Sequence, residues 1–258
     1  MIRLVLGIVV ILTLLAACEK KPEKQRRKIA HATIFIFPDT TEEDLAKLHP
    51  INLDTSYVEY VFKAYNLVDI KTLDSTILVQ LQYADTTNFL KKNMYDGLRK
   101  AYFTCETALR VAAAQYYLKQ IHPHYSLVIY DASRPLHIQQ MMWDSLDLPP
   151  LTKLSYLSNP QTAGMHNYGC AVDCSIIDTQ SGMALDMGTG YDEFSKLSQP
   201  VLEYHFLQTK ELSKEAYENR RLLRYVMRRA KLNSINTEWW HFSAVSADEA
   251  LSNYQLIK

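Results

Sequence analysis

Apolar residues recur at steps of three and four along one long segment, and this period predicts a helix over residues 97–121. Cys105 lies on the apolar stripe of that helix, so we expect it in the core. The stripe consists of Leu98, Tyr102, Cys105, Leu109, Ala112 and Tyr116. We also expect helices over residues 57–65, 136–146 and 213–230. The last of these carries arginines that should form a mostly solvated face: Arg220, Arg221, Arg224, Arg228 and Arg229.

Strand patterns are shorter and more scattered. Apolar and polar residues alternate over residues 77–83, as they do in a half-buried strand. We expect buried strands over residues 126–130 and 170–177. The N-terminal part, residues 31–76, combines a β-prone segment at 33–37 with a helix-like one at 42–48 and indicates no chemistry. Long helices mixed with scattered strands indicate an α+β domain.

Composition narrows the class of protein further. A chain of 258 residues suits one sizeable domain. Its 28 basic residues are balanced by 28 acidic ones, so it lacks the overall positive field that attracts nucleic acid. We therefore expect no nucleic-acid partner.

The first residues resemble a secretory signal. Arg3 precedes an apolar run over residues 4–15, which is shorter than the roughly 20 residues of a membrane-spanning helix. Leu15-Ala16-Ala17-Cys18 resembles the lipobox of bacterial lipoproteins, in which the cysteine carries the lipid. We predict a signal peptide over residues 1–18 with a lipid anchor at Cys18, a flexible tether over 19–30 and one domain over 31–258. An uncleaved N-terminal anchor is the alternative, and both place the domain in the bacterial cell envelope, facing the periplasm or at the outer membrane.

Three cysteines remain after Cys18, so at most one internal disulfide is available. If residues 170–177 form a strand, Cys170 and Cys174 have Cα atoms roughly 13 Å apart, too far for a bridge to each other. Both then point away from Asp173, because side chains alternate along a strand. A thiolate metal site is therefore disfavoured.

Two short segments, residues 164–173 and 238–241, bring together the residue types of a metal site. A catalytic zinc needs about three protein ligands and an open position for water, and His166, Asp173 and His241 supply them. Glu238 then remains free to take a proton from that water. Either segment alone has a plainer interpretation, since a single histidine can be structural and Glu238 can flank a packed aromatic cluster.

The order of these motifs resembles the D-alanyl-D-alanine dipeptidase family. The pattern His-x-x-Gly-x-Ala-x-Asp begins at His166, and Glu-x-Trp-His begins at Glu238. Further matches follow the family's order within residues 77–243. They are Gln82-Tyr83-Ala84-Asp85-Thr86-Thr87-Asn88-Phe89, Asp131-Ala132-Ser133-Arg134-Pro135 and Leu185-Asp186-Met187-Gly188-Thr189-Gly190-Tyr191-Asp192.

This resemblance implies one Zn²⁺ per chain, bound by His166, Asp173 and His241. It further implies that Glu238 is the acid/base and that Arg134 stabilises the oxyanion of a dipeptide attacked by zinc-bound water. It also implies a single α+β domain with a small antiparallel-rich sheet flanked by helices, like the hedgehog and DD-peptidase zinc enzymes. The substrate class would be D-alanyl-D-alanine or a similar dipeptide of cell-wall metabolism.

Three more residues are candidates for substrate binding. A free dipeptide carries an ammonium and a carboxylate close together, so its pocket needs countercharges, and Asp192 is our candidate for the ammonium. Tyr83 is expected to line the same site, although an aromatic residue at a strand position can equally be core. Asp131 is expected either to orient Arg134 or to cap a turn.

Departures from the family pattern concern selectivity. The family commonly has Ser where this chain has Gly164, and Ser-Arg where it has Asn167-Tyr168. Neither position is a ligand or the predicted base. Two alternative functions stay open: a zinc D,D- or L,D-carboxypeptidase that trims peptidoglycan stem peptides, and a non-catalytic peptide-binding lipoprotein.

Overall fold

The computed structural model describes residues 56–154 and 156–258. The predicted signal peptide, Cys18, the tether and the segments at 33–37 and 42–48 lie outside the described residues. In the part of the chain that is described, no helix has both the length and the apolar character needed to cross a membrane.

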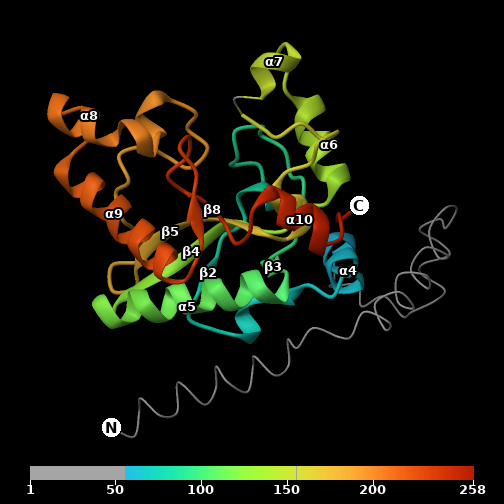
Figure 1. Ribbon diagram of the computed structural model, residues 1–258, viewed down its shortest axis with the longest axis horizontal. Helices are drawn as coiled ribbons and strands as arrows, with labels where there is room; N and C mark the ends of the chain where they lie inside the picture. Colours follow the sequence, from blue (N-terminus) through green and yellow to red (C-terminus); the bar gives the residue numbers. More distant parts are fainter. Residues whose placement is uncertain (1–55, 155) are drawn as a thin grey trace, which may run out of the picture. The chain divides into compact units, whose positions relative to one another are not determined.

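The described chain folds into short strands interleaved with helices (Figure 1). The helices are α4 (Tyr57–Ala64), α5 (Cys105–Ile121), α6 (Leu136–Ser145), α7 (Pro150–Lys153), α8 (Glu203–Thr209), α9 (Lys214–Arg229) and α10 (Ala247–Asn253). The strands are β1 (Val68–Asp69), β2 (Leu78–Val79), β3 (Tyr102–Phe103), β4 (Tyr125–Asp131), β5 (Ala171–Asp178), β6 (Met183–Ala184), β7 (Asn233–Ser234) and β8 (His241–Ser243).

One sheet organises the domain. Its strands follow the order β2-β4-β5-β8-β7, and β6 also pairs with β5. The β2–β4 pair is parallel and the other pairs are antiparallel. Strands β1 and β3 form a separate antiparallel pair. The prediction of a fold that mixes helices and sheet is confirmed, whereas the likeness to the hedgehog and DD-peptidase enzymes stays a prediction.

The first long helix was predicted with the wrong start and the wrong face. Helix α5 begins at Cys105, because the Thr104 hydroxyl caps it by accepting a hydrogen bond from the Thr107 amide at 3.3 Å. Leu98 and Tyr102 precede the helix, so the apolar stripe counted from them does not coincide with the buried face of α5. Tyr116, which belongs to that stripe, is 41% exposed, and Cys105 is only half-buried. The buried face consists of Thr107, Ala108, Val111, Ala114, Gln115 and Leu118.

Most other predicted elements are present. Helices α4, α6 and α9 and strands β4 and β5 lie within one or two residues of the expected bounds. The strand expected over residues 77–83 is reduced to β2, because the chain turns into a 3₁₀ segment at Gln82–Ala84 and the Tyr83 carbonyl accepts the amides of Met94 and Tyr95 instead. The arginine face of α9 is exposed only in part, because Arg220 is buried.

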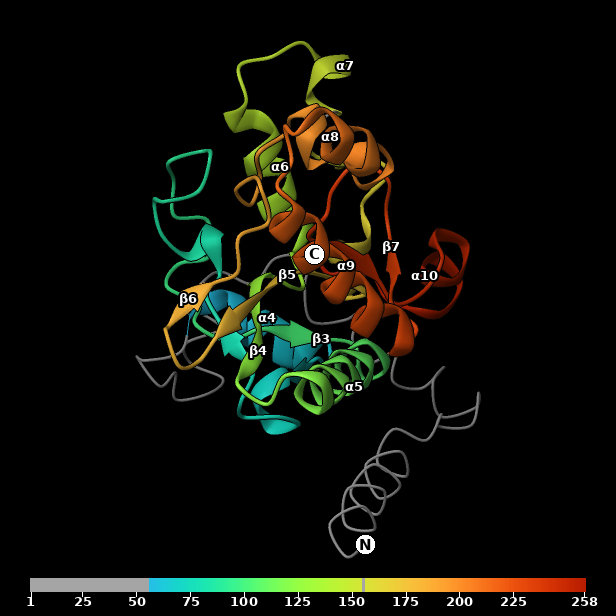
Figure 2. The same ribbon diagram turned by 90° about the vertical axis from the view of Figure 1, so that its left-hand side faces the viewer.

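Strand β5 runs through the centre of the domain. Val172, Cys174 and Ile176 belong to the core, where α5 and α9 pack against each other and against the sheet. Helices α6 and α7 lie on the side away from α5 (Figures 1 and 2). Cys170 and Cys174 are buried free thiols, so the prediction that they do not bridge each other is confirmed.

A β-bulge aligns three polar residues across neighbouring strands. The register between β4 and β5 is regular up to Ile129↔Cys174 and then shifts, so that Asp131 pairs with Asp173. An unbroken register would place Asp131 opposite Val172 and turn its side chain to the other face of the sheet. Since Asp173 also pairs with His241 of β8, the row Asp131, Asp173, His241 crosses three strands.

Gly169 links the first metal-site motif to β5 and generates a prediction about stability. Its φ is +67°, and an added Cβ would lie 2.9 Å from Ser133 Oγ and 3.2 Å from the Thr104 amide. Gly169→Ala should therefore lower the free energy of unfolding by about 2 kcal/mol or more, measured by denaturant titration. Gly182→Ala is the matched control, because Gly182 has φ +73° but open space around it. Equal losses in the two variants would contradict a packing constraint at Gly169.

Candidate metal and active site

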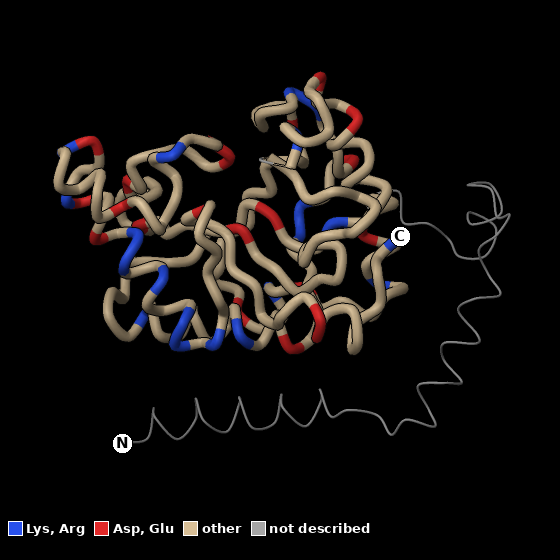
Figure 3. The backbone as a smooth tube through the Cα atoms, turned by 45° about the horizontal axis from the view of Figure 1, so that its top comes forward, with Lys and Arg blue, Asp and Glu red and all other residues tan. Residues whose placement is uncertain are grey.

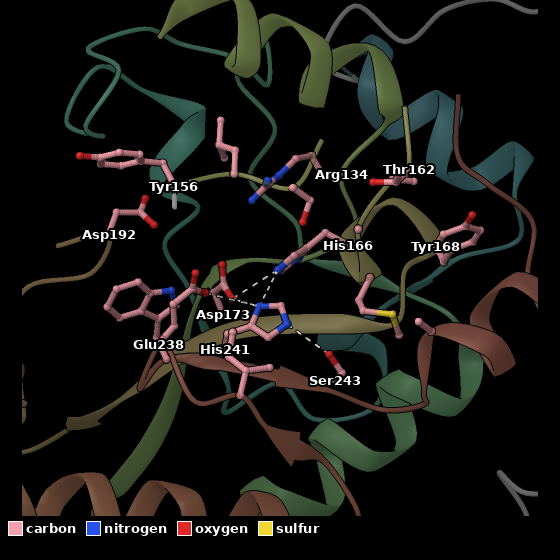
Figure 4. A pocket seen from close by; sticks show the side chains of 18 of the residues that line it. Arg134, Tyr156, Thr162, His166, Tyr168, Asp173, Asp192, Glu238, His241 and Ser243 are labelled. Carbon is pink, nitrogen blue, oxygen red and sulfur yellow. Dashed lines mark hydrogen bonds and ion pairs between the residues drawn. The ribbon is translucent and has the colours of Figure 1, made fainter. Parts of the chain in front are cut away.

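Three side chains from distant parts of the chain converge on one point (Figure 4). His166 Nε2 lies 3.3 Å from Asp173 Oδ1 and 3.2 Å from His241 Nδ1, and the last two atoms are 2.9 Å apart. Ligands about 2.0–2.1 Å from a tetrahedral centre are separated by about 3.3 Å. Two nitrogens and one carboxylate oxygen at these separations fit a zinc ion with an open position.

Local structure explains how each ligand is placed. Asp173 and His241 are cross-strand partners in β5 and β8. His166 lies in the 3₁₀ segment Met165–Tyr168, which Gly169 ends in a left-handed conformation just before β5. The His166 carbonyl accepts the Arg134 amide at 3.0 Å, so the end of β4 is joined to this segment.

Each histidine has a partner on its outer nitrogen. His166 Nδ1 donates to the Ala132 carbonyl at 2.6 Å, so in the neutral ring Nε2 carries no proton and is directed at the shared point. His241 Nε2 lies 3.2 Å from Ser243 Oγ, and its Nδ1 is directed at the same point. One outer partner is therefore a backbone group and the other is a side chain.

The electrostatics hold Asp173 as a carboxylate. Burial favours its neutral form, but His166 and His241 outweigh burial and hold the pKa of Asp173 well below its usual range. Burial likewise lowers the pKa of His166, and the Asp173 carboxylate more than compensates, so the net shift is upward. Asp173 Oδ2 accepts the Tyr191 hydroxyl at 3.0 Å, which leaves Oδ1 for the metal.

Glu238 lines the pocket next to the three ligands. Its Oε2 is 4.0 Å from His241 Nδ1, and burial raises the pKa of its carboxyl group. The neighbouring Trp239 and Trp240 are packed in an aromatic cluster, with Trp240 against Tyr191 and Phe194. The two interpretations of this segment are therefore compatible. The packed tryptophans hold the segment in place, and Glu238 extends from it into the pocket.

Arg134 is buried and held on two sides. Its Nε donates to Asp131 Oδ2 at 3.0 Å, Nη2 donates to the same oxygen, and Nη1 donates to Gln139 Oε1 at 2.8 Å. The guanidinium also lies 5.2 Å from the centre of the Tyr83 ring. These contacts fix the arginine while it lines the pocket above the ligands (Figure 4).

The candidate substrate-binding residues differ in position. Asp192 lines the pocket, accepts the Tyr83 hydroxyl at 2.7 Å, and has its pKa raised by burial. Tyr83 also lines the pocket, and it lies in the 3₁₀ turn rather than in a strand. Asp131 is fully buried between Arg134 and Tyr95, and it does not reach the pocket wall. Its contacts are those of a residue that orients Arg134.

Both departures from the family pattern have structural counterparts. A Cβ on Gly164 would lie 2.7 Å from Ser158 Oγ, so Ser158 occupies the space of a side chain at position 164. Asn167 is buried and joins two parts of the site, because its Oδ1 accepts the Gly164 amide at 2.7 Å and its Nδ2 donates to the Arg134 carbonyl at 2.8 Å.

Residues that the sequence did not single out complete the surroundings of the ligands. They are Gln139, Tyr191 and Ser243, which contact Arg134, Asp173 and His241 respectively. Of these three residues, only Tyr191 lies in a segment that matches the family pattern, so only Tyr191 could have been identified from the sequence. The pocket has a volume of about 350 Å³, and Figure 4 shows Asp192 and Glu238 on one side of the ligands and Tyr168 and Ser243 on the other.

The three candidate ligands and the nearby carboxylate have the composition of a metallopeptidase site, and comparisons with known proteins give the family. A family model described as D-ala-D-ala dipeptidase matches residues 63–256. The chain therefore belongs to the D-alanyl-D-alanine dipeptidase family, a family of metallo-dipeptidases.

Three relatives carry the same name. The chain is 30% identical to the D-alanyl-D-alanine dipeptidase of Escherichia coli over 181 residues, which cover 70% of this chain and 86% of the relative. It is 30% identical to that of a Synechocystis strain over 52% of this chain and 65% of the relative. The Enterococcus faecium enzyme is 27% identical over 50% of this chain and 66% of the relative.

Zinc affinity should depend on the outer partner of His241. Ser243→Ala removes the hydroxyl that fixes the ring, so we expect the zinc dissociation constant to rise about 10- to 100-fold in chelator competition. Ser243→Thr keeps a hydroxyl and should stay close to wild type. A folded Ser243→Ala variant with unchanged zinc affinity would show that strand pairing alone orients His241.

Proposed function

We propose that this protein is a zinc-dependent dipeptidase that hydrolyses D-alanyl-D-alanine or a similar free dipeptide in cell-wall peptide metabolism. The observation that supports the proposal is the convergence in one pocket of three candidate zinc ligands, a half-buried carboxylate that accepts no hydrogen bond from the described chain, and a fixed guanidinium. A zinc ion held by His166, Asp173 and His241 would supply a Lewis acid toward water and the peptide carbonyl.

Glu238 is the proposed acid/base. Its carboxylate faces the pocket beside His241, and no protein donor in the described chain occupies it through a hydrogen bond. The raised pKa makes it a stronger proton acceptor than an exposed glutamate. It can accept a proton from the attacking water and then pass that proton to the leaving nitrogen.

Arg134 is the proposed oxyanion partner. Asp131 and Gln139 engage three of its N–H groups, and the remaining N–H groups on Nη1 and Nη2 are available to the pocket. Because the guanidinium is already held in place, it can stabilise negative charge on the carbonyl oxygen without reorganising. The same rigidity supports a role in the transition state more than in initial binding.

Asp192 is the proposed partner of the substrate's ammonium group. It lies in a pocket whose other carboxylates belong to the metal ligand Asp173 and to the base Glu238. Tyr83 holds one of its oxygens, which aims the carboxylate. A pocket of about 350 Å³ is at the small end of the roughly 300–1,000 Å³ range for small-molecule sites, which favours a dipeptide over a stem peptide.

The proposed location of the protein is the bacterial cell envelope. It rests on residues 1–18 of the sequence, and a free dipeptide released during cell-wall turnover would be encountered there.

Glu238→Gln tests the proposed chemistry. We expect zinc-loaded wild-type protein to release D-alanine from D-alanyl-D-alanine faster than from a stem pentapeptide. In Glu238→Gln, kcat should fall at least about 100-fold with zinc content unchanged, because the amide cannot accept the proton. Amine release and metal analysis measure both quantities.

Glu249→Gln is the control, since Glu249 is an exposed carboxylate in the first turn of α10. Unchanged turnover in Glu238→Gln would refute the assigned role. Preferential trimming of the pentapeptide would favour the carboxypeptidase alternative, and hydrolysis of neither substrate would favour the binding lipoprotein.

A further inference from the structure

Arg220 is a buried cation outside the active site. Basic residues recur along α9 (Figure 3), but Arg220 is only 1% exposed. In the described part of the chain it forms no ion pair, and the neighbouring Glu203 pairs with Arg224 instead. Burial lowers the pKa of Arg220 to about 10, which leaves it protonated at neutral pH. Burying a charge without a carboxylate partner is costly, so its donors must be satisfied in another way.

All three acceptors of Arg220 belong to the loop of residues 187–198. Nε donates to the Met187 carbonyl at 2.6 Å, Nη1 to the Leu197 carbonyl at 2.9 Å and Nη2 to Thr189 Oγ1 at 3.3 Å. The guanidinium therefore joins the two ends of this loop to each other and to α9. Opening of the loop would leave a buried charge without acceptors, which couples the loop's position to Arg220.

The loop is also fastened to the segment that carries Glu238. Thr189 Oγ1 accepts the Trp239 indole N–H at 2.8 Å, and the Trp239 ring lies 5.9 Å from the Arg220 guanidinium. Thr189 is thus shared between α9 and the residue next to the proposed base.

The middle of the loop supplies two groups to the active site. Tyr191 donates to the outer oxygen of Asp173, and Asp192 lines the pocket. Asp192 has φ +57°, a left-handed conformation that costs free energy in most residues with a side chain and that aspartate adopts more readily than most. The bonds from Arg220 to Thr189 and Leu197 lie on both sides of Asp192.

We infer that Arg220 is a positioning residue for recognition of the substrate's amino terminus. It holds the loop of residues 187–198 closed, and the loop holds Asp192 in the pocket. This inference rests on the proposed function, in which Asp192 binds the ammonium group. An arginine is required because its planar fork reaches three acceptors at once, which a lysine ammonium on a flexible stem does not.

Selectivity for a charged amino terminus separates this role from a merely structural one. Arg220→Lys and Arg220→Met are compared with Arg221→Met, because Arg221 is the next residue, is exposed and pairs with Glu218. Each zinc-loaded full-length variant is assayed on D-alanyl-D-alanine and on its N-acetylated form. Hydrogen exchange is measured across residues 187–198.

In Arg220→Lys we expect KM for the free dipeptide to rise about tenfold or more, since a misplaced Asp192 weakens a charge-assisted contact. The preference in kcat/KM for the free over the acetylated dipeptide should fall by a similar factor. Exchange should quicken in the loop and not in β5. Arg221→Met should stay within about twofold of wild type.

A folded Arg220→Lys variant with the wild-type preference and wild-type loop exchange would overturn the inference. A wild-type enzyme that hydrolyses no free dipeptide would instead overturn the proposed function, and with it the role of Arg220 in recognition. If both Arg220 variants fail to fold, Thr189→Val removes one acceptor from the loop side. It should then shift the preference in the same direction by a smaller factor, and an unchanged preference would again overturn the inference.

Discussion

The cross-strand pair of Asp173 and His241 is the contact on which the rest of the site depends. Antiparallel pairing of β5 and β8 sets the two ligands directly opposite each other, and a carboxylate between two imidazoles stays ionised despite its burial. His166 completes the set from the segment that leads into β5. The β-bulge in β4 then brings Asp131 into the same row, and Asp131 fixes Arg134. The candidate metal site and the proposed oxyanion partner therefore share one piece of sheet.

Two buried arginines organise the walls of the pocket in different ways. Arg134 is held by a carboxylate and an amide, and two of its N–H groups remain for the contact with substrate that we propose. Arg220 donates to two backbone carbonyls and one hydroxyl of the loop of residues 187–198. It can influence the site only through the position of that loop. The first arrangement suits a group that acts on developing charge. The second arrangement suits a residue that holds a loop in position, because the Arg220 guanidinium has its hydrogen-bond acceptors only while the loop packs against α9.

The sequence predicted most of the helices and long strands, and it predicted residues that the fold brings together. The order of the motifs predicted the three candidate ligands. The alternation of side chains along a strand excluded Cys170 and Cys174 as ligands. What it missed depends on contacts between distant residues. The bulge that turns Asp131 toward Asp173, the Gln139 contact to Arg134 and the burial of Arg220 leave no local pattern in the chain. The start of α5 was predicted too early because the periodic apolar positions continue on the N-terminal side of Thr104, the residue that caps the helix.

The proposed zinc site is tested most directly by a crystal structure of the zinc-loaded protein with anomalous diffraction at the zinc edge. We expect one zinc peak bonded to His166 Nε2, Asp173 Oδ1 and His241 Nδ1 at about 2.0–2.2 Å, with Glu238 beside the metal but outside its ligand set. A peak coordinated by Glu238 in place of Asp173, or located away from these three residues, would contradict it.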